Sequence, residues 1–231
     1  MKTIGLIGGL SWESSALYYR HINEIVRERR GGLHSAKLLL WSFDFAEVAE
    51  RQHEGDWDGA KRMMVDAAKR LEGAGADCIG ICTNTMHIMA EDVQAASGVP
   101  LIHIADAAGT AARRRGIKRP ALLGTRFTME KPFYAERLRE KHDLDVLTPD
   151  EAGRKVVHDT IYNELCQGLV RPESKAAYLG EIGRLRERGA DAVILGCTEI
   201  VMLIGQEDTD LPVLDTTRLH AEALAEFALV R

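Results

Sequence analysis

The sequence has few aromatic residues, no long apolar run and no excess of basic residues. Phe, Trp and Tyr make up 6% of its 231 residues, and its formal net charge is −5. No apolar stretch approaches the roughly 20 residues of a membrane-spanning helix. Residues 1–9 run into polar sequence too soon for a secretion signal. A basic surface of the kind that binds nucleic acid is not indicated either, so we expect neither a nucleic acid nor a membrane as a partner.

Cysteine is also scarce. The chain has four cysteines, which are Cys78, Cys82, Cys166 and Cys197. Their spacing fits neither a zinc knuckle nor the disulfide framework of a small secreted domain, and no other cluster of side chains has metal-ligand character. We therefore expect reduced thiols in a cytoplasmic protein, with no metal site.

What the sequence does contain is a regular alternation of short apolar stretches and helical segments. Strands are expected at 3–7, 37–43, 75–82, 101–104, 119–124, 144–147, 189–196 and 211–214. Helices are expected at about 11–29, 57–72, 84–96, 106–115, 128–141, 151–168, 173–188 and 216–228, with a further helix after 199. Residues 44–57 are expected to be mostly irregular. Strands that alternate with helices throughout indicate parallel sheets.

The sequence repeats itself at a fixed distance. Gly75-Ala76-Asp77 aligns with Gly189-Ala190-Asp191, and without a gap Thr83 then falls opposite Cys197. The next two aligned pairs are Asn84 with Thr198 and Thr85 with Glu199. We therefore predict an α/β fold of two pseudo-symmetric Rossmann-like domains, each a parallel sheet flanked by helices.

The predicted domains are residues 1–103 plus 214–231, which include a returning C-terminal helix, and residues 104–213. We expect the active site in the cleft between them, because ligand sites commonly occupy such interfaces. Thr83 would then approach a ligand from one side and Cys197 from the other, which suits inversion at a carbon atom. The alternative is a duplication that serves stability alone.

Residues 193–199 hold the most informative single feature. An apolar strand ends at Gly196, and a thiol follows at once. The carboxyl ends of strands are where open α/β sheets bind ligands, and a helix start there lowers the pKa of a thiol. The alternative interpretation is that Cys197 is a small buried hydrophobic residue.

Three motifs, in order along the chain, resemble those of the cofactor-independent aspartate/glutamate racemases. They are Gly8-Gly9-Leu10-Ser11-Trp12-Glu13-Ser14, Thr83-Asn84-Thr85-Met86-His87 and Gly196-Cys197-Thr198-Glu199. The resemblance covers essentially the whole chain and is nearest to the L-aspartate/glutamate-specific branch, in which threonine replaces the first cysteine. It implies catalysis without pyridoxal phosphate or another cofactor, an aspartate and/or glutamate substrate, and usually a homodimer.

The resemblance also implies the roles of individual residues. Cys197 and Thr83 form the catalytic pair. The implied substrate contacts are Leu10, Gln52, Asn84, Thr85, Thr198 and Glu199. An alkoxide is far harder to form than a thiolate, so we expect Cys197 to be the competent base. The resemblance to the L-specific branch implies that the L-enantiomer is kinetically favoured. Whether Thr83 donates a proton or only positions the substrate stays open.

One departure from the family concerns recognition of the substrate's side-chain carboxylate. Many members carry a lysine near the position of Cys166, and Arg51 or Arg126 would have to replace it here. His87 and His103 are interpreted as structural histidines, since buried polar groups are usually paired. The rival functions are an arylmalonate-type decarboxylase of the same superfamily and a catalytically weakened amino-acid-binding protein.

Overall fold

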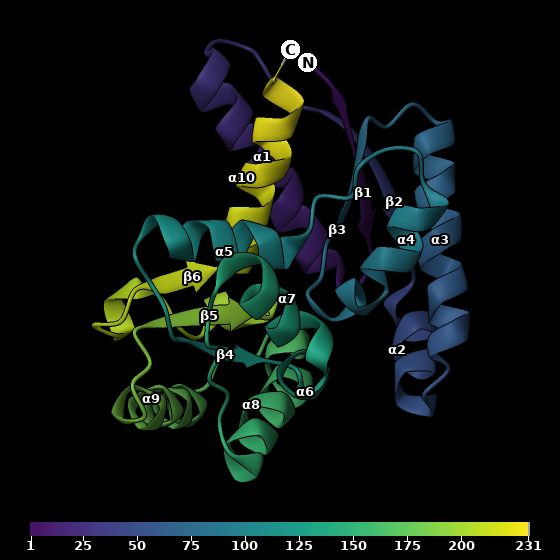
Figure 1. The fold of residues 1–231 in the computed structure, drawn as a ribbon. Coiled ribbons are helices and arrows are strands. Elements are labelled where there is room, and N and C mark those ends of the chain that lie inside the picture. The colour runs from purple at the N-terminus through teal and green to yellow at the C-terminus, as the bar shows by residue number, and fades with distance from the viewer. Residues whose placement is uncertain (231) are drawn as a thin grey trace. The chain divides into compact units, whose positions relative to one another are not determined.

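Strands and helices alternate along the chain in the computed structural model, which describes residues 1–230 (Figure 1). Every pair of neighbouring strands in the two sheets is parallel. The predicted α/β class, with parallel sheets flanked by helices, is confirmed. The chain divides into two compact units, Met1–Ile104 with His220–Arg231 and Ala105–Leu219.

The sheet of the first unit has the strand order β2-β1-β3. Its strands are β1 (Thr3–Gly8), β2 (Lys37–Ser42) and β3 (Cys78–Ile81). A single bridge from Ile79 to Leu101 extends it beyond β3. β2 is an edge strand, whereas all four residues of β3 are buried.

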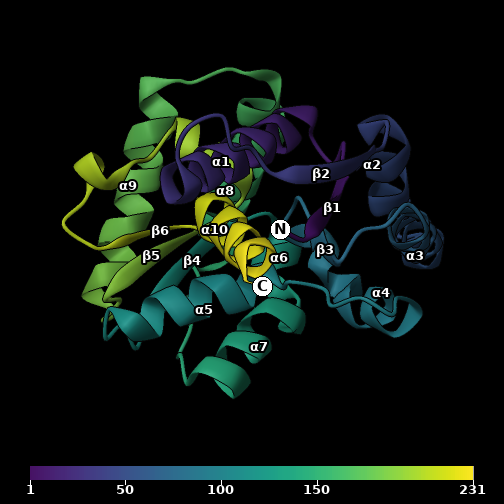
Figure 2. The same ribbon diagram turned by 90° about the horizontal axis from the view of Figure 1, so that it is seen from above.

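Helices cover both faces of this sheet (Figure 2). One face is covered by α1 (Trp12–Arg30) and the C-terminal helix α10 (Thr216–Leu229), and the other by α2 (Phe45–Glu54), α3 (Trp57–Gly73) and α4 (Ala90–Ala96). Side chains of a strand alternate between the two faces. Leu6 accordingly lies in the core with α1 and α10, and Ile7 lies in the core with α3.

The sheet of the second unit has the order β4-β5-β6. Its strands are β4 (Pro120–Gly124), β5 (Ala192–Gly196) and β6 (Val213–Asp215). The flanking helices are α5 (Ile104–Arg114), α6 (Arg126–Glu130), α7 (Pro132–His142), α8 (Glu151–Asn163) and α9 (Pro172–Glu187). Figure 1 shows α5 on one face of the sheet and α8 and α9 on the other.

The sequence repeat corresponds to a repeated hydrogen bond from a backbone N–H group to an aspartate side chain. Asp77 Oδ2 accepts from Thr3 N at 2.6 Å, and Asp191 Oδ1 accepts from Arg119 N at 2.9 Å. Ahead of these residues, Gly75 and Gly189 have left-handed φ values of 95° and 93°. In the first unit an aspartate therefore connects the starts of the neighbouring strands β1 and β3, and in the second unit an aspartate connects the starts of β4 and β5.

The structure differs from the prediction in several short elements. Residues 44–57 contain α2 instead of an irregular segment, because the Asp44 side chain caps the helix by accepting from Ala46 N at 3.0 Å. The strands predicted at 101–104 and 144–147 are reduced to single bridges, formed by Leu101 and Leu147. The helix predicted at 128–141 is divided into α6 and α7, since Pro132 begins a new helix.

The unit boundaries also differ from the predicted domains. Residues 214–219, assigned by the prediction to the first domain, lie in the second unit. β6 pairs with β5, and Thr216 Oγ1 donates to Leu195 O at 2.7 Å, which holds the start of α10 there. Ile104, predicted to begin the second domain, closes the main segment of the first unit.

Candidate active site

In the first unit, the turn between β1 and α1 is built around a glycine. Gly9 has φ +71°, and a Cβ atom there would collide with the backbone of Phe43. Ser15 Oγ accepts from Gly9 N at 2.8 Å, and Ser11 caps α1 by accepting from Ser14 N at 3.3 Å. This tight turn brings Leu10 to the carboxyl edge of the sheet.

Thr83, Asn84 and Thr85 lie at the same edge, directly after β3. Cys82 N still donates to Ile7 O at 2.9 Å, as in the sheet, and the chain then turns into the 3-10 helix η1 (Thr85–Met89). Thr83 is half-buried, and the two residues after it are buried. The first N–H groups of such a helix have no acceptor within the helix, so donors and a hydroxyl gather at this edge.

The structure also brings Leu10 and Gln52 to this loop. Gln52 is buried on α2, and its Nε2 donates to Met86 Sδ in η1 at 3.0 Å. Leu10 is buried in the same core cluster as Met86. The unexpected helix α2 thus carries Gln52 to the loop that holds Thr83.

In the second unit, Cys197, Thr198 and Glu199 follow β5 and enter the 3-10 helix η3 (Thr198–Met202). Cys197 Sγ donates to Glu199 Oε2 at 2.9 Å, and Thr198 Oγ1 donates to the same oxygen at 2.7 Å. Cys197 is 9% exposed and Glu199 is 7% exposed. A buried thiol therefore donates a hydrogen bond to a buried carboxylate.

The surroundings of Cys197 keep this thiol protonated. Burial raises the pKa of Cys197 well above its usual value, and the negative charge of Glu199 raises it further. Burial also raises the pKa of Tyr162, and the charges of Cys197 and Cys166 add to that rise. Tyr162 and Cys166 are thus neighbours of the thiol. The resemblance had drawn attention to the position of Cys166, in the short helix η2 (Leu165–Gln167), as that of a lysine in many members. The sequence did not predict Tyr162, because α8 lies far from Cys197 along the chain.

Comparison with known proteins assigns the family. The model of the family described as Asp/Glu/hydantoin racemase matches residues 7–224. The chain belongs to the Asp/Glu/hydantoin racemase family. Its enzyme class is therefore that of the racemases, which are isomerases.

Individual relatives of this racemase span its full length. A broad-specificity amino-acid racemase of Bacillus subtilis is 21% identical over an alignment of 230 residues that covers 95% of each chain. The structure of a candidate Asp/Glu racemase from Yersinia pestis is 49% identical with a TM-score of 0.94 and covers 100% of both chains. That of an aspartate racemase homologue from Pyrococcus horikoshii is 37% identical with a TM-score of 0.86 and covers 99% of both.

The two arginines considered for the racemase's substrate carboxylate differ in their surroundings. Arg51 forms an ion pair with Asp56, and this partner also caps α3. The Arg126 side chain is 59% exposed and reaches Glu130 only at 4.0 Å. Arg126 N donates to His158 Nδ1 at 3.2 Å, two residues after β4 ends. The Arg126 side chain is therefore the less constrained of the two.

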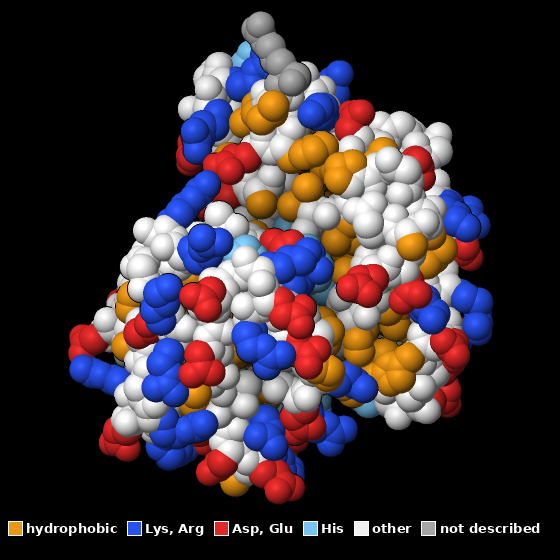
Figure 3. Space-filling view, viewed as in Figure 1, with side chains coloured by type: hydrophobic (Ala, Val, Ile, Leu, Met, Phe, Trp, Pro, Cys, Tyr) orange, Lys and Arg blue, Asp and Glu red, His pale blue; other side chains and the backbone are white. Residues whose placement is uncertain are grey.

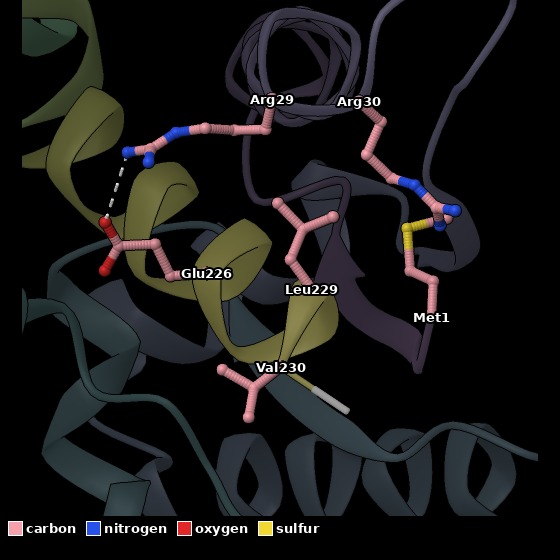
Figure 4. Close-up of a pocket in the computed structure, with 6 residues that line it drawn as sticks. All are labelled: Met1, Arg29, Arg30, Glu226, Leu229 and Val230. Carbon is pink, nitrogen blue, oxygen red and sulfur yellow. Dashed lines mark ion pairs between the residues drawn. The ribbon is translucent and has the colours of Figure 1, made fainter.

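A cavity of about 640 Å³ lies elsewhere in the first unit of the racemase (Figure 4). Arg29 and Glu226 form an ion pair of 3.8 Å across it. It lies where α1 and α10 end and β1 begins, at the amino edge of the sheet. Ligands of open α/β sheets bind at the carboxyl edge, and none of the motif residues lines this cavity.

The surface of the racemase mixes charges of both signs. Figure 3 shows Lys and Arg side chains interspersed with Asp and Glu over the face in view. Within residues 1–230, none of the helices combines the length and the apolar character that a membrane crossing needs. In that same part of the chain, no group of three or more His, Cys, Asp or Glu side chains could hold a metal ion.

Proposed function

We propose that this chain is a cofactor-independent amino acid racemase that acts on aspartate and/or glutamate and kinetically favours the L-enantiomer. The observation that carries the proposal is the buried thiol of Cys197, hydrogen-bonded to Glu199 at the carboxyl end of β5. The family membership supports racemase chemistry. The Pyrococcus relative, described as an aspartate racemase homologue, supports an acidic substrate.

In the proposed reaction, Cys197 and Thr83 act on opposite faces of the substrate's α-carbon. The Cys197 thiolate removes the α-proton of the L-enantiomer, so that the Sγ–H bond forms as the Cα–H bond breaks. The carbanion then takes a proton on its other face from the Thr83 hydroxyl, directly or through a water molecule. Because a hydroxyl is a far weaker acid than a thiol, the step at Thr83 limits inversion.

Glu199 has a defined part in this proposal. Its charge contributes to the raised pKa of Cys197 in the empty site. A substrate ammonium group placed against Glu199 would offset that charge, because an opposite charge within about 4–6 Å favours the ionised form of a neighbour. Substrate binding thereby favours the thiolate that the reaction requires.

Backbone N–H groups are the proposed donors for the substrate's α-carboxylate. Asn84, Thr85 and Thr198 supply them from the first turns of η1 and η3. Donors fixed at the position where negative charge develops stabilise a carbanion conjugated with a carboxylate. Leu10 and Gln52 are proposed to shape the pocket beside them.

Glu199→Gln should make Cys197 easier to ionise in the empty enzyme. Removal of the carboxylate charge lowers the Cys197 pKa, and about one unit of change raises the thiolate fraction about tenfold at a pH below that pKa. The rate of Cys197 alkylation by iodoacetamide, followed by peptide mass spectrometry across pH, measures this change.

Glu207→Gln is the matched control, because it neutralises an exposed carboxylate elsewhere in the second unit. It should leave the alkylation profile of Cys197 in place. A Glu199→Gln profile that coincides with that of the wild type would contradict the assigned effect of Glu199 on the thiol.

We also propose that the chain forms a homodimer in the cytoplasm. The edge strand β2 exposes Leu40 and Trp41 by 47% and 37%, and Trp12 and Tyr19 on α1 are 70% and 60% exposed. An apolar strand edge readily pairs with another chain. None of the four cysteines forms a disulfide within residues 1–230, which supports a reducing compartment.

Leu40→Lys should convert the dimer to a monomer, because it places a charge on the proposed contact. Molar mass from light scattering after gel filtration measures the change. Val170→Lys, at a residue 50% exposed in the second unit, should remain dimeric. A monomeric wild type, or a dimer that Leu40→Lys leaves intact, would rule out this interface.

A substrate panel tests the function itself. D- and L-aspartate, D- and L-glutamate and an aryl malonate are incubated with the protein and analysed by chiral chromatography. We expect inversion of aspartate, glutamate or both. Decarboxylation of the aryl malonate without any inversion would replace the proposal with the decarboxylase function, and binding without turnover would favour an amino-acid-binding protein.

A further inference from the structure

The carbonyl group of Thr83 is held by a histidine from its own loop. His87 Nδ1 lies 2.7 Å from Thr83 O, and the residue is only 2% exposed. On the other side of the ring, Ile104 N donates to His87 Nε2 at 3.2 Å. His87 thus links the Thr83 loop to the segment that leads into α5.

These two contacts fix the tautomer of His87. A backbone N–H group can only donate, so Nε2 must present its lone pair to Ile104. A neutral imidazole carries one N–H group, and that hydrogen is therefore on Nδ1, where it is donated to Thr83 O. A doubly protonated ring would set two N–H groups against each other at Nε2.

The same segment is fixed two residues earlier by a second buried histidine. His220 Nε2 lies 2.6 Å from Ile102 O, and Tyr18 OH lies 2.7 Å from His220 Nδ1. Because Ile102 O can only accept, Nε2 carries the hydrogen and Tyr18 donates to Nδ1. The rings of His87 and His220 are 5.6 Å apart. Burial lowers the pKa of His220 to about 4, so this ring is neutral as well.

The consequence for the site follows from the geometry of one peptide group. Thr83 O and Asn84 N belong to the same peptide unit, and residues 1–230 contain no cis peptide bond. In a trans peptide the C=O and N–H groups point in opposite directions. A carbonyl held toward His87 therefore aims the Asn84 N–H group away from it.

We propose that His87 is a positioning residue that orients the Thr83–Asn84 peptide, and through it the Asn84 N–H donor for a substrate α-carboxylate. The inference rests on the proposed function, because it gives a direction to one donor of that site. A purely structural role would make His87 a cross-link between residues 83 and 104 and nothing more.

Two substitutions separate these roles. His87→Asn keeps an amide donor where Nδ1 lies, so it preserves the bond to Thr83 O and loses the one to Ile104. His87→Gln reaches the Nε2 position, so it keeps an acceptor for Ile104 and loses the donor to Thr83. Tyr18→Phe is the matched control, because it removes a buried hydrogen bond from the same histidine cluster without touching either contact of His87.

The first readout is ligand binding, followed as the shift of the Asn84 amide in nitrogen-15 NMR spectra during titration with L-aspartate or L-glutamate. We expect His87→Asn and Tyr18→Phe to keep the wild-type Kd within about threefold and His87→Gln to weaken it at least tenfold. The second readout is kcat for inversion, which should follow the same order while the melting temperatures do not.

Several results would overturn the inference. They are an Nε2–H tautomer of His87 in long-range proton–nitrogen spectra, equal losses in His87→Asn and His87→Gln, and an Asn84 amide that neither ligand shifts. A wild type that binds these ligands at Asn84 and inverts neither would refute the racemase proposal alone. The binding order of the variants would still decide the role of His87.

Discussion

Cys197→Ala is expected to reduce exchange of the α-proton of L-aspartate and L-glutamate by a factor of about 10²–10⁴. Loss of a positioned base removes a contribution of this size from catalysis, which corresponds to about 3–5 kcal/mol of the barrier. The substitution removes the atom that donates to Glu199. Proton NMR of the substrate in deuterated water measures the exchange rate.

Cys82→Ala is the control for this variant. Cys82 is fully buried on the face of the sheet that packs against α1 and α10, and burial raises its pKa. It precedes Thr83 by one residue, yet we expect its removal to leave exchange within about twofold of the wild type, since its side chain is packed in the apolar core and has no carboxylate partner there. Full exchange in Cys197→Ala would show that the base is another residue.

Thr83→Cys is expected to have the second-largest effect, a gain of about tenfold or more in the rate of inversion. A thiol titrates near pH 8.5 and serves as both proton donor and base, whereas a threonine hydroxyl is a poor base. The substitution restores the residue that the family motif usually carries at this position. Chiral chromatography of the product measures the gain.

Thr83→Ser and Thr83→Ala complete this series. Serine keeps the hydroxyl, so inversion should stay near the wild-type rate if Thr83 donates a proton. Alanine should then abolish inversion and leave exchange of the L-enantiomer largely in place. If Thr83→Ala inverts as fast as the wild type, Thr83 only positions the substrate and the proton comes from another donor.

The strands that the sequence predicted best are β1, β2 and β4, whose ends each lie within one residue of the prediction. β3 and β5 begin three residues later than predicted, because the left-handed glycines Gly75 and Gly189 place the residues before each strand in a turn. The strands predicted at 101–104 and 144–147 lie at the edges of their sheets, and each keeps only one bridged residue, Leu101 and Leu147. A single bridge there satisfies the same short apolar pattern.

The segment 44–57 shows why local composition misled the prediction. Its helix α2 buries Val48 and Gln52, and Phe45 and Ala49 are half-buried beside them. These residues follow helical spacing, but the polar Gln52 takes one place of the buried face and charged residues stand between them, so the apolar pattern is short. The helix is fixed instead by the Asp44 cap and by the bond from Gln52 to Met86, and the second of these depends on the tertiary structure.

The motif residues lie at the carboxyl edges of the two sheets, but the motifs did not predict how those residues interact. The Cys197–Glu199 bond arises because the chain turns into η3 directly after the cysteine. The bond from His87 to Thr83 arises in the same way at η1. Such contacts depend on the conformation of a single turn, which residue types alone do not determine.

In the proposed mechanism, a single effective base, Cys197, serves one face of the substrate. Because the equilibrium constant between the two enantiomers is one, kcat/KM for inversion must be equal in the two directions. The asymmetry between the enantiomers must therefore be measured as the rate of α-proton exchange relative to the rate of inversion. The decisive measurement follows deuterium incorporation and enantiomer composition together, starting separately from L- and D-glutamate or aspartate. Deuterium enters the substrate only where the thiol hydrogen of Cys197 exchanges with solvent before it returns to the carbanion.

We predict that, from the L-enantiomer, deuterium enters the recovered L-form faster than the D-form appears. From the D-enantiomer, exchange should not run ahead of inversion, because proton removal on that face depends on Thr83. Equal ratios of exchange to inversion from both enantiomers would contradict the single-base account. The absence of both exchange and inversion would contradict racemase activity on these substrates.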